Sequence, residues 1–380
     1  MSVFHSIKIK SQLTKMMWMI ILWVFSLHIF VIIRFAGNPS SVNPIDPTAP
    51  VDISAVLLNI TRGGIILGIA FGIVDIIFDR RVFKVMSYGR LILIKSIAYI
   101  FLFVSISLYT NLVSFTIYYG DLDFGPWAKN AARLSWVAPL VYVSLVSILI
   151  NTLKQFELKF GPGNLFRFLI GKFHKPQSDH RIFMFMDMKS STTIAEKLGH
   201  LQVSRLIQDC FTDLAIVKDY KAEVYQYVGD EVVISWSMAK GLENLNCIRA
   251  YFKFQNLLEL RSDFYKTKYG FVPFFKAGLN VGDVTIAEVG QIKREIAFHG
   301  DTLNTASRIQ DKCNEYKKSL LLSQHIKELI EDNEELQINL VGEIMLRGKA
   351  QPLKIYSIDE IDMIKINPPE KYLTYLDSRN

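Results

Sequence analysis

Cysteine is scarce in this chain. Its 380 residues include three cysteines, Cys210, Cys247 and Cys313, which lie far apart in the sequence. Disulfide-dependent secreted domains need a denser, paired set of cysteines, and zinc sites need closely spaced ones. The composition therefore excludes both a disulfide scaffold and a cysteine zinc site. It predicts three reduced cysteines that are buried as small apolar residues.

Acidic residues are also in the minority, because 36 Asp and Glu stand against 43 Lys and Arg, a net charge of +7. A basic balance can indicate nucleic-acid binding. Here, however, many of the bases flank apolar segments, where they set the orientation of a membrane protein. We therefore expect a lipid bilayer, and no nucleic acid, among the partners.

Long apolar runs are abundant in the first half of the chain. A membrane-spanning helix needs about 20 mostly apolar residues. Four runs of about this length carry at most one charge each, so they predict four spans: residues 16–33, 63–78, 91–109 and 134–153. Three charged residues, Arg62, Asp75 and Lys95, lie in or at the ends of these runs. Snorkelling at the interface and a signalling role both fit them.

The loops between the spans differ in charge. The N-terminus and residues 79–90 are rich in Lys and Arg, whereas residues 38–52 and 118–125 contain neither. By the positive-inside rule, both termini lie in the cytoplasm of a cell (inner or plasma) membrane. The predicted organisation is a transmembrane domain over 1–153, a connecting segment over 154–180, a second domain over 181–360 and a tail over 361–380.

The connecting segment mixes aromatic and basic residues, and its "GPG" at 161–163 breaks a continuous helix. Two interpretations remain open for it. The segment lies along the membrane surface as an amphipathic coupling element, or it is a simple linker.

Strands alternate with helices in the second half. The pattern predicts a buried strand at 181–188, helices at 189–199, 201–218, 243–268 and from 300, hairpins around 229–230 and over 274–290, and a final strand pair before 358. The hydroxyl residues after the first strand are suited to capping the helix that follows. This order indicates an α+β, ferredoxin-like core behind the α-helical membrane domain.

Two acidic residues stand at positions where they could meet. Asp187 ends the first strand, and Asp230 sits on the turn of a hairpin expected beside that strand. Paired carboxylates repel unless a cation such as Mg²⁺ or Mn²⁺ lies between them. The helix start after Asp187 would offer its backbone N–H groups to phosphate. The four residues of this helix start are Lys189, Ser190, Ser191 and Thr192. The alternative is a capping Asp187 and a turn Asp230 without metal.

Four segments in this order resemble the successive motifs of class III nucleotidyl cyclases: "FMFMDMKSSTTIAEKLG", "YVGDEVVISW", "GLNVGDVTIAEVG" and "HGDTLNTASRIQ". The resemblance covers residues 181–358. It implies conversion of a purine nucleoside triphosphate to its 3′,5′-cyclic monophosphate and pyrophosphate, on two divalent cations (Mg²⁺ or Mn²⁺). It also implies a homodimer with composite sites at the interface.

The resemblance assigns roles to individual residues. Asp187 and Asp230 would be the metal ligands, and Asn304 would orient the ribose while Arg308 stabilises the transition state. Arg347 would hold the terminal phosphates, with Lys349 close by. Lys293 and Arg294 align more loosely and are weaker phosphate candidates.

The purine-reading positions depart from the family pattern. Gln226 stands where adenylate cyclases usually have Lys and guanylate cyclases Glu, and Ala297 stands where their partner residue is Asp, Thr or Cys. Gln both donates and accepts, so it can pair with either base. ATP is expected over GTP on cellular abundance and on the commonness of adenylate cyclases.

Two other functions are weighed against this one. The "VGDEVV" segment is a little similar to the turn of diguanylate cyclases, but Val228 replaces the first Gly of that motif. A membrane receptor with a degenerate, non-catalytic cyclase domain, which binds nucleotide or only dimerises, is the second. Gln226 and Ala297 favour that receptor, and the complete set of acids with Asn304 and Arg308 opposes it.

Overall fold

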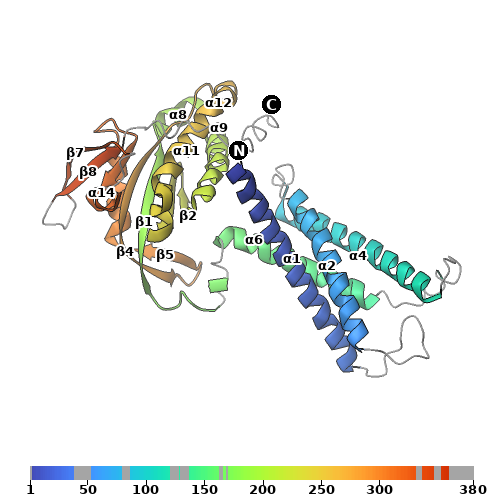
Figure 1. Cartoon of the computed structure of the whole chain (residues 1–380). Coiled ribbons are helices and arrows are strands. Elements are labelled where there is room, and N and C mark those ends of the chain that lie inside the picture. Colours follow the sequence, from blue (N-terminus) through green and yellow to red (C-terminus); the bar gives the residue numbers. More distant parts are fainter. Residues whose placement is uncertain are drawn as a thin grey trace. The chain divides into compact units, whose positions relative to one another are not determined.

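The computed structural model of the chain describes residues 2–37, 53–78, 86–119, 128, 137–161, 166–167, 170–330, 336–345 and 352–358. The chain divides into two compact units, residues 1–162 and 163–380. The first unit is helical, and the second contains the whole β-sheet (Figure 1).

Four long helices form the first unit: α1 (Ser2–Gly37), α2 (Ile53–Phe78), α4 (Tyr88–Tyr119) and α6 (Val137–Phe160). Each contains a stretch long and apolar enough to cross a membrane: Gln12–Ile33, Val56–Phe78, Tyr88–Val113 and Val137–Glu157. The prediction of four apolar helices is therefore confirmed.

Glycines let α1 and α2 pack closely. A Cβ added at Gly64 would lie 2.8 Å from the Cα of Val24, and one added at Gly68 would lie 2.5 Å from the Cα of Ile20. Small residues at this spacing allow helix backbones to approach where lipid supplies no hydrophobic drive.

One carboxylate, that of Asp75, joins three of these helices. It accepts hydrogen bonds from Lys95 Nζ at 3.0 Å and Tyr99 Oη at 2.8 Å, both on α4, and it also pairs with Lys154 on α6. Asp75 and Lys95 are buried at 9% and 6% exposure. Snorkelling is therefore wrong for Asp75 and Lys95, whose opposite charges neutralise each other inside the bundle. Arg62, in contrast, is exposed.

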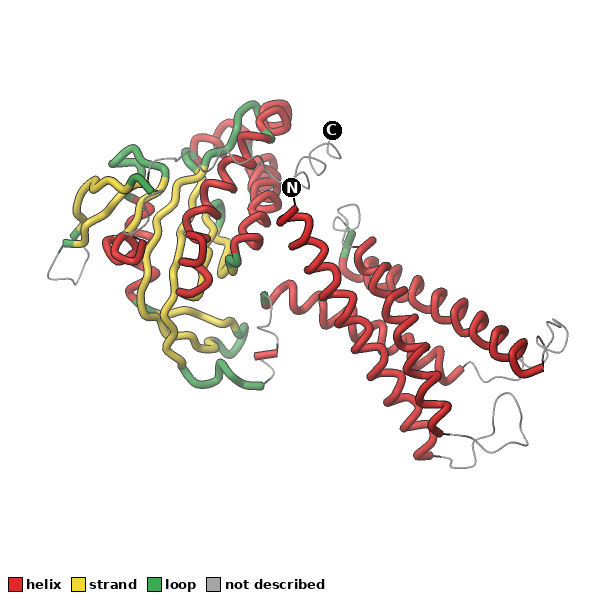
Figure 2. The backbone as a smooth tube through the Cα atoms, in the orientation of Figure 1, coloured by secondary structure: helices red, strands yellow, loops and turns green. Residues whose placement is uncertain are grey.

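The second unit contains a mixed sheet, whose strands are yellow in Figure 2. Its strand order is β2-β3-β1-β4-β6-β8-β7, with β5 paired to β4. Strand β1 (Gln177–Met188) lies antiparallel between β3 (Glu231–Ser237) and β4 (Phe275–Val289). The remaining strands are β2 (Glu223–Val228), β5 (Glu295–His299), β6 (Leu320–Ser323), β7 (Ile338–Ile344) and β8 (Leu353–Ile358). The predicted α+β fold is confirmed, since only β4 and β6 run parallel among these pairs.

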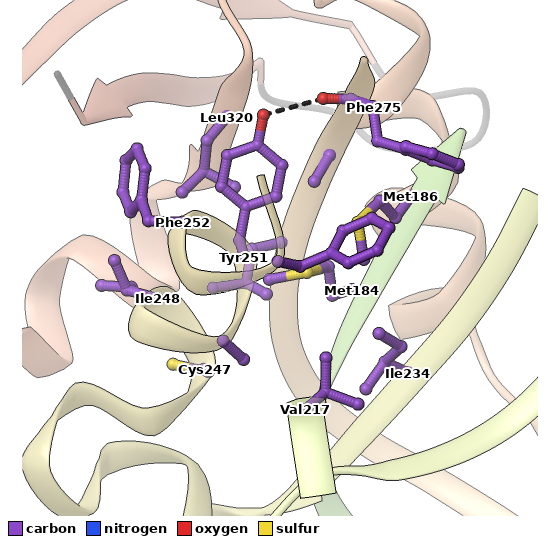
Figure 3. Close-up of a cluster of buried hydrophobic side chains, with 14 of the residues drawn as sticks. Met184, Met186, Val217, Ile234, Cys247, Ile248, Tyr251, Phe252, Phe275 and Leu320 are labelled. Carbon is purple, nitrogen blue, oxygen red and sulfur yellow. Dashed lines mark hydrogen bonds between the residues drawn. The ribbon is translucent and has the colours of Figure 1, made fainter. Parts of the chain in front are cut away.

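Successive side chains of a strand point to opposite faces of the sheet, and they form two separate hydrophobic cores. Met184 and Met186 of β1 pack with residues of α9 (His200–Asp213) and α11 (Asn246–Leu260) in the larger cluster. In that cluster the Tyr251 hydroxyl donates to the Phe275 carbonyl at 2.8 Å (Figure 3). Phe183 faces the other way, toward Ala306 of α13 (Asp301–Asp311). The sheet thus has helices on both faces.

Several predicted elements are corrected. The hairpin expected over 274–290 is one long strand, β4, whose hairpin partner is β5. Gly282 is therefore not a turn residue. It lies within β4 and leaves room for Thr302 of α13, since a Cβ there would lie 2.6 Å from the threonine Oγ1.

Two predicted helices are shorter than expected. The helix at 201–218 ends as α9 at Asp213 and continues as a 3₁₀ segment, Leu214–Tyr220. The helix at 243–268 divides into α11 and α12 (Ser262–Tyr269), with Arg261 between them. Arg261 is fully buried and pairs with the buried Asp213, an interaction that a regular helix pattern does not reveal. Strand β6 and α14 (Gln324–Ile330) were not predicted.

Candidate active site

The register of the sheet brings Asp187 and Asp230 together. Asp187 is the second-last residue of β1, whose Met186 lies opposite Val232 of β3. Asp230 lies in the β2–β3 turn, where Gly229 takes a positive φ of 63°. Burial, followed by the hydrogen bond and negative charge of Asp230, raises the pKa of Asp187 to about 7. The Asp230 carboxyl thus lies close enough to Asp187 to oppose the ionisation of Asp187.

The residues at this point fit a divalent cation. Within the described residues, the Asp230 Oδ2 atom is buried and has no hydrogen-bond partner, which is costly for a carboxylate oxygen. A cation between the acids would satisfy this oxygen and remove the repulsion between the two carboxylates. No group of three or more His, Cys, Asp or Glu gathers anywhere in the described chain. The protein therefore offers two carboxylates, which suits Mg²⁺, an ion that keeps several waters and binds substrate phosphates.

Lys276 is a candidate site residue that the sequence analysis missed. It is the cross-strand partner of Asp187 on β4, and its Nζ lies 3.7 Å from Asp187 Oδ2. The Lys276 side chain is only 9% exposed, so its charge acts in a poorly solvated place. Lys276 is identified by its position opposite Asp187, and this position is known only when the strand register is known.

The helix start after Asp187 differs from the prediction. The Lys189 N–H donates to the Phe274 carbonyl at 2.8 Å, so this N–H group is not free to bind a phosphate as predicted. Ser190 has a φ of 60° and makes no capping bond through its side chain, so capping by this serine is wrong. Helix α8 (Ser191–Leu198) begins at the next residue. The N–H groups of Ser191 and Thr192, at the start of this helix, have no partner within a helix and are suited to anions.

The two purine-reading positions lie on strands that touch. A bulge in β2 lies between Val224, opposite Ile234 of β3, and Gln226, opposite Val233, and Gln226 is exposed. Ala297 lies on β5, next to Phe298. The Phe298 ring packs edge-on against Tyr225 at 4.9 Å, and its N–H donates to the Tyr225 hydroxyl at 3.3 Å. Strands β2 and β5 therefore meet beside both positions.

Asn304 and Arg308 lie on α13 with the helical spacing i, i+4, which places them on one side of the helix. Thr305 and Ile309 are buried, whereas Asn304 is exposed and Arg308 is half-buried. In the described part of the chain neither side chain hydrogen-bonds or pairs with another residue, the two acids included.

Of the remaining predicted basic residues, Lys293 and Arg294 are described, and they are not brought to this point. Arg347 and Lys349 lie outside the described residues. Arg294 pairs with Glu288, and Lys293 pairs with Glu295, in the hairpin between β4 and β5.

Two relatives with curated functions match part of this chain. Adenylate cyclase 2 of Rhizobium meliloti (strain 1021) is 29% identical over 233 residues, which is 61% of this chain and 64% of that protein. The terminal-differentiation-specific adenylate cyclase of Dictyostelium discoideum is 26% identical over 185 residues, 46% of this chain and 8% of that protein. The chain thus spans less than two thirds of the length of both relatives.

Solved structures agree on the fold. Two structures of a bacterial light-regulated adenylyl cyclase match with TM-scores of 0.51 and 0.50 at 18% and 19% identity. Each match covers 65% of this chain and 72% of the other. The family model for the adenylate and guanylate cyclase catalytic domain matches residues 173–360. With the paired acids and the arrangement of the sheet, this match shows that the chain carries, in residues 173–360, a member of the class III nucleotidyl cyclase family.

Proposed function

We propose that this protein is a membrane-bound adenylate cyclase that converts ATP to 3′,5′-cyclic AMP and pyrophosphate. The observation that carries the proposal is the contact between Asp187 and Asp230, with an unsatisfied carboxylate oxygen and Lys276 beside it. The family of residues 173–360 and the names of the curated relatives support it.

Each group has a role that follows from its charge and place. Two bound Mg²⁺ or Mn²⁺ ions, held by Asp187 and Asp230, would supply Lewis-acid chemistry at the α-phosphate. Lys276, a buried cation 3.7 Å from Asp187, would balance the charge of the triphosphate. Arg308 would stabilise the charge that develops in the transition state, and Asn304 would orient the ribose.

The terminal phosphates need further donors. We assign them to Arg347 and Lys349, and to the first-turn N–H groups of α8. Gln226 and Ala297 define the purine site. ATP is favoured over GTP because the curated relatives are adenylate cyclases, while Gln226 itself can pair with either base.

The active unit is a homodimer in this proposal. Among the described residues, Asn304 and Arg308 make no ion pair or hydrogen bond with the acids. We place these two halves of the site on different chains that meet across a two-fold axis. An Asp187→Ala chain co-expressed with an Arg308→Ala chain should then recover activity through one intact composite site. Activity no higher than that of either variant alone would contradict the dimeric site.

The membrane placement follows from the charge pattern. We place the protein in the cell membrane as a multi-pass protein with residues 1–153 as its transmembrane domain. The N-terminus and the catalytic domain (181–360) would be cytoplasmic, with 154–180 as the connection and 361–380 as a tail.

The direct test uses the full-length protein in membranes with Mn²⁺ and either ATP or GTP. Cyclic AMP that disappears in Asp230→Asn, but persists in the matched control Asp283→Asn, is the expected result. Asp283 is 88% exposed and pairs with His180 away from the acids, so its change tests for non-specific damage. No cyclic product from either nucleotide in folded, dimeric protein would instead favour a receptor with a non-catalytic cyclase domain.

A further inference from the structure

The segment that leads into the catalytic domain is fastened before β1 begins. This leading segment (residues 170–176) contains a turn in which His174 N–H donates to the Gly171 carbonyl at 3.1 Å, and Gly171 has a φ of 70°. Phe173 is buried at 5% exposure. The segment is therefore docked on the domain and does not hang free.

Glu288, near the end of β4, holds this segment. Its N–H donates to the Phe173 carbonyl at 2.9 Å, and its Oε2 accepts from His174 Nδ1 at 2.7 Å. Its Oε1 accepts from Arg294 Nη1 at 3.4 Å. A carboxylate only accepts, so Nδ1 of His174 carries the proton. The Glu288 side chain is 8% exposed, and a buried carboxylate that loses a partner is costly.

Strand β4 connects Glu288 to the residues of the proposed active site. At Gly278 the backbone of α13 lies so close that an added Cβ would be 2.7 Å from the Cα of Gln310. The Thr302 hydroxyl donates to the Asp283 carbonyl at 2.8 Å, which fixes the start of α13 to the same strand. Close-packed elements of this kind shift together and do not deform separately. The first residues of β4 include Lys276, the partner of Asp187.

We propose that Glu288 is a positioning residue through which the chain arriving from the membrane unit sets the place of the β4–β5 hairpin and of α13. A pull or twist on the leading segment would act on Glu288, then on β4, and so on Asn304 and Arg308. The catalytic consequence rests on the proposed function, whereas the mechanical link does not.

Hydrogen exchange on the full-length protein in nanodiscs tests the link without any assay of turnover. Glu288→Gln removes the charge and keeps the size of the side chain. Loss of hydrogen bonds to a buried charge should speed exchange about tenfold in residues 171–176 and in residues 295–311. The matched control is Lys293→Ala. It removes the ion pair between Lys293 and Glu295 in the same hairpin, and this ion pair does not include a residue of the leading segment. It should leave residues 171–176 unchanged.

The pattern of exchange distinguishes a mechanical link through Glu288 from a local effect and from destabilisation of the whole domain. Faster exchange confined to residues 171–176 would overturn the proposal, as would an equal effect of Lys293→Ala on that segment. If exchange also rises in the β1 core at 182–186, the domain itself is destabilised. His174→Gln, which leaves Glu288 in place, then becomes the test variant under the same criteria.

Activity supplies a second reading of the same variants. For Glu288→Gln we expect kcat for cyclic AMP formation to fall about fivefold with KM for ATP within about twofold, as for displaced catalytic groups. A change in KM alone would contradict positioning of α13. A wild-type protein without any activity would refute the proposed function and leave the exchange result standing.

Discussion

Gly278 supports the close contact between β4 and α13, and its replacement by alanine is the sharpest perturbation that the structure offers. The added Cβ would lie 2.7 Å from the Cα of Gln310 and closer still to the Gln310 nitrogen and the Ala306 carbonyl oxygen. All three are backbone atoms, so no side-chain rotation can relieve the clash.

The size of the effect follows from this geometry. Ordinary contacts of a Cβ begin at 3.4 Å, so α13 must move away from β4 by roughly 1 Å. Overpacking of this kind costs about 1–3 kcal/mol, and 1 kcal/mol corresponds to about 2–4 °C in Tm for a domain of this size. A 1 Å displacement of catalytic groups costs about a hundredfold in rate. In the role proposed for it, Arg308 on α13 should therefore lose most of its effect.

The assay combines thermal melting of the second unit with cyclic AMP formation by the full-length protein. Gly278→Ala should melt at least a few degrees lower and lose most of its activity. Gly89→Ala is the control, because among the described residues no atom beyond its own chain neighbours and helix backbone lies within 4 Å of the added Cβ. A Gly278→Ala protein with wild-type Tm and wild-type kcat would refute the argument that α13 is held in backbone contact with β4.

Three further predictions concern buried polar groups. Asp213→Ala leaves the fully buried guanidinium of Arg261 unpaired and should cost about 3–5 kcal/mol, whereas the double variant Asp213→Leu/Arg261→Met should recover most of it. Equal Tm values for the single and double variants would contradict this. Burial raises the pKa of the Cys247 and Cys313 thiols to about 12, so at pH 8 only roughly one in 10⁴ is thiolate. Iodoacetamide should label them only after unfolding, and rapid labelling of native protein would show that they are accessible. Asp75→Asn leaves two lysines of the helical bundle without their shared carboxylate, so this variant should melt lower in detergent than wild type. An unchanged melting curve would mean that the cluster contributes nothing to the bundle.

Local patterns predicted the long and continuous elements well. The four apolar helices were found because a run of about 20 apolar residues has few other stable solutions. Strand β1 was found because it is buried on both faces, and it does end close to Asp187. The prediction failed where a short sequence was compatible with two local structures, a turn and a strand. Gly282 and Asp283 indicate a turn by composition, yet they lie within a strand because Thr302 of α13 needs the space.

The sequence by itself determined the two-part organisation, the α+β pattern and the order of acidic and basic residues along the chain. These features depend on hydrophobic length, on periodicity and on spacing within one segment. Only the tertiary structure decided which distant residues share an environment. Strand register placed Lys276 against Asp187, and packing of the leading segment placed His174 against Glu288. Such pairs join residues about 90 to 115 positions apart, and no local property of either partner encodes the other.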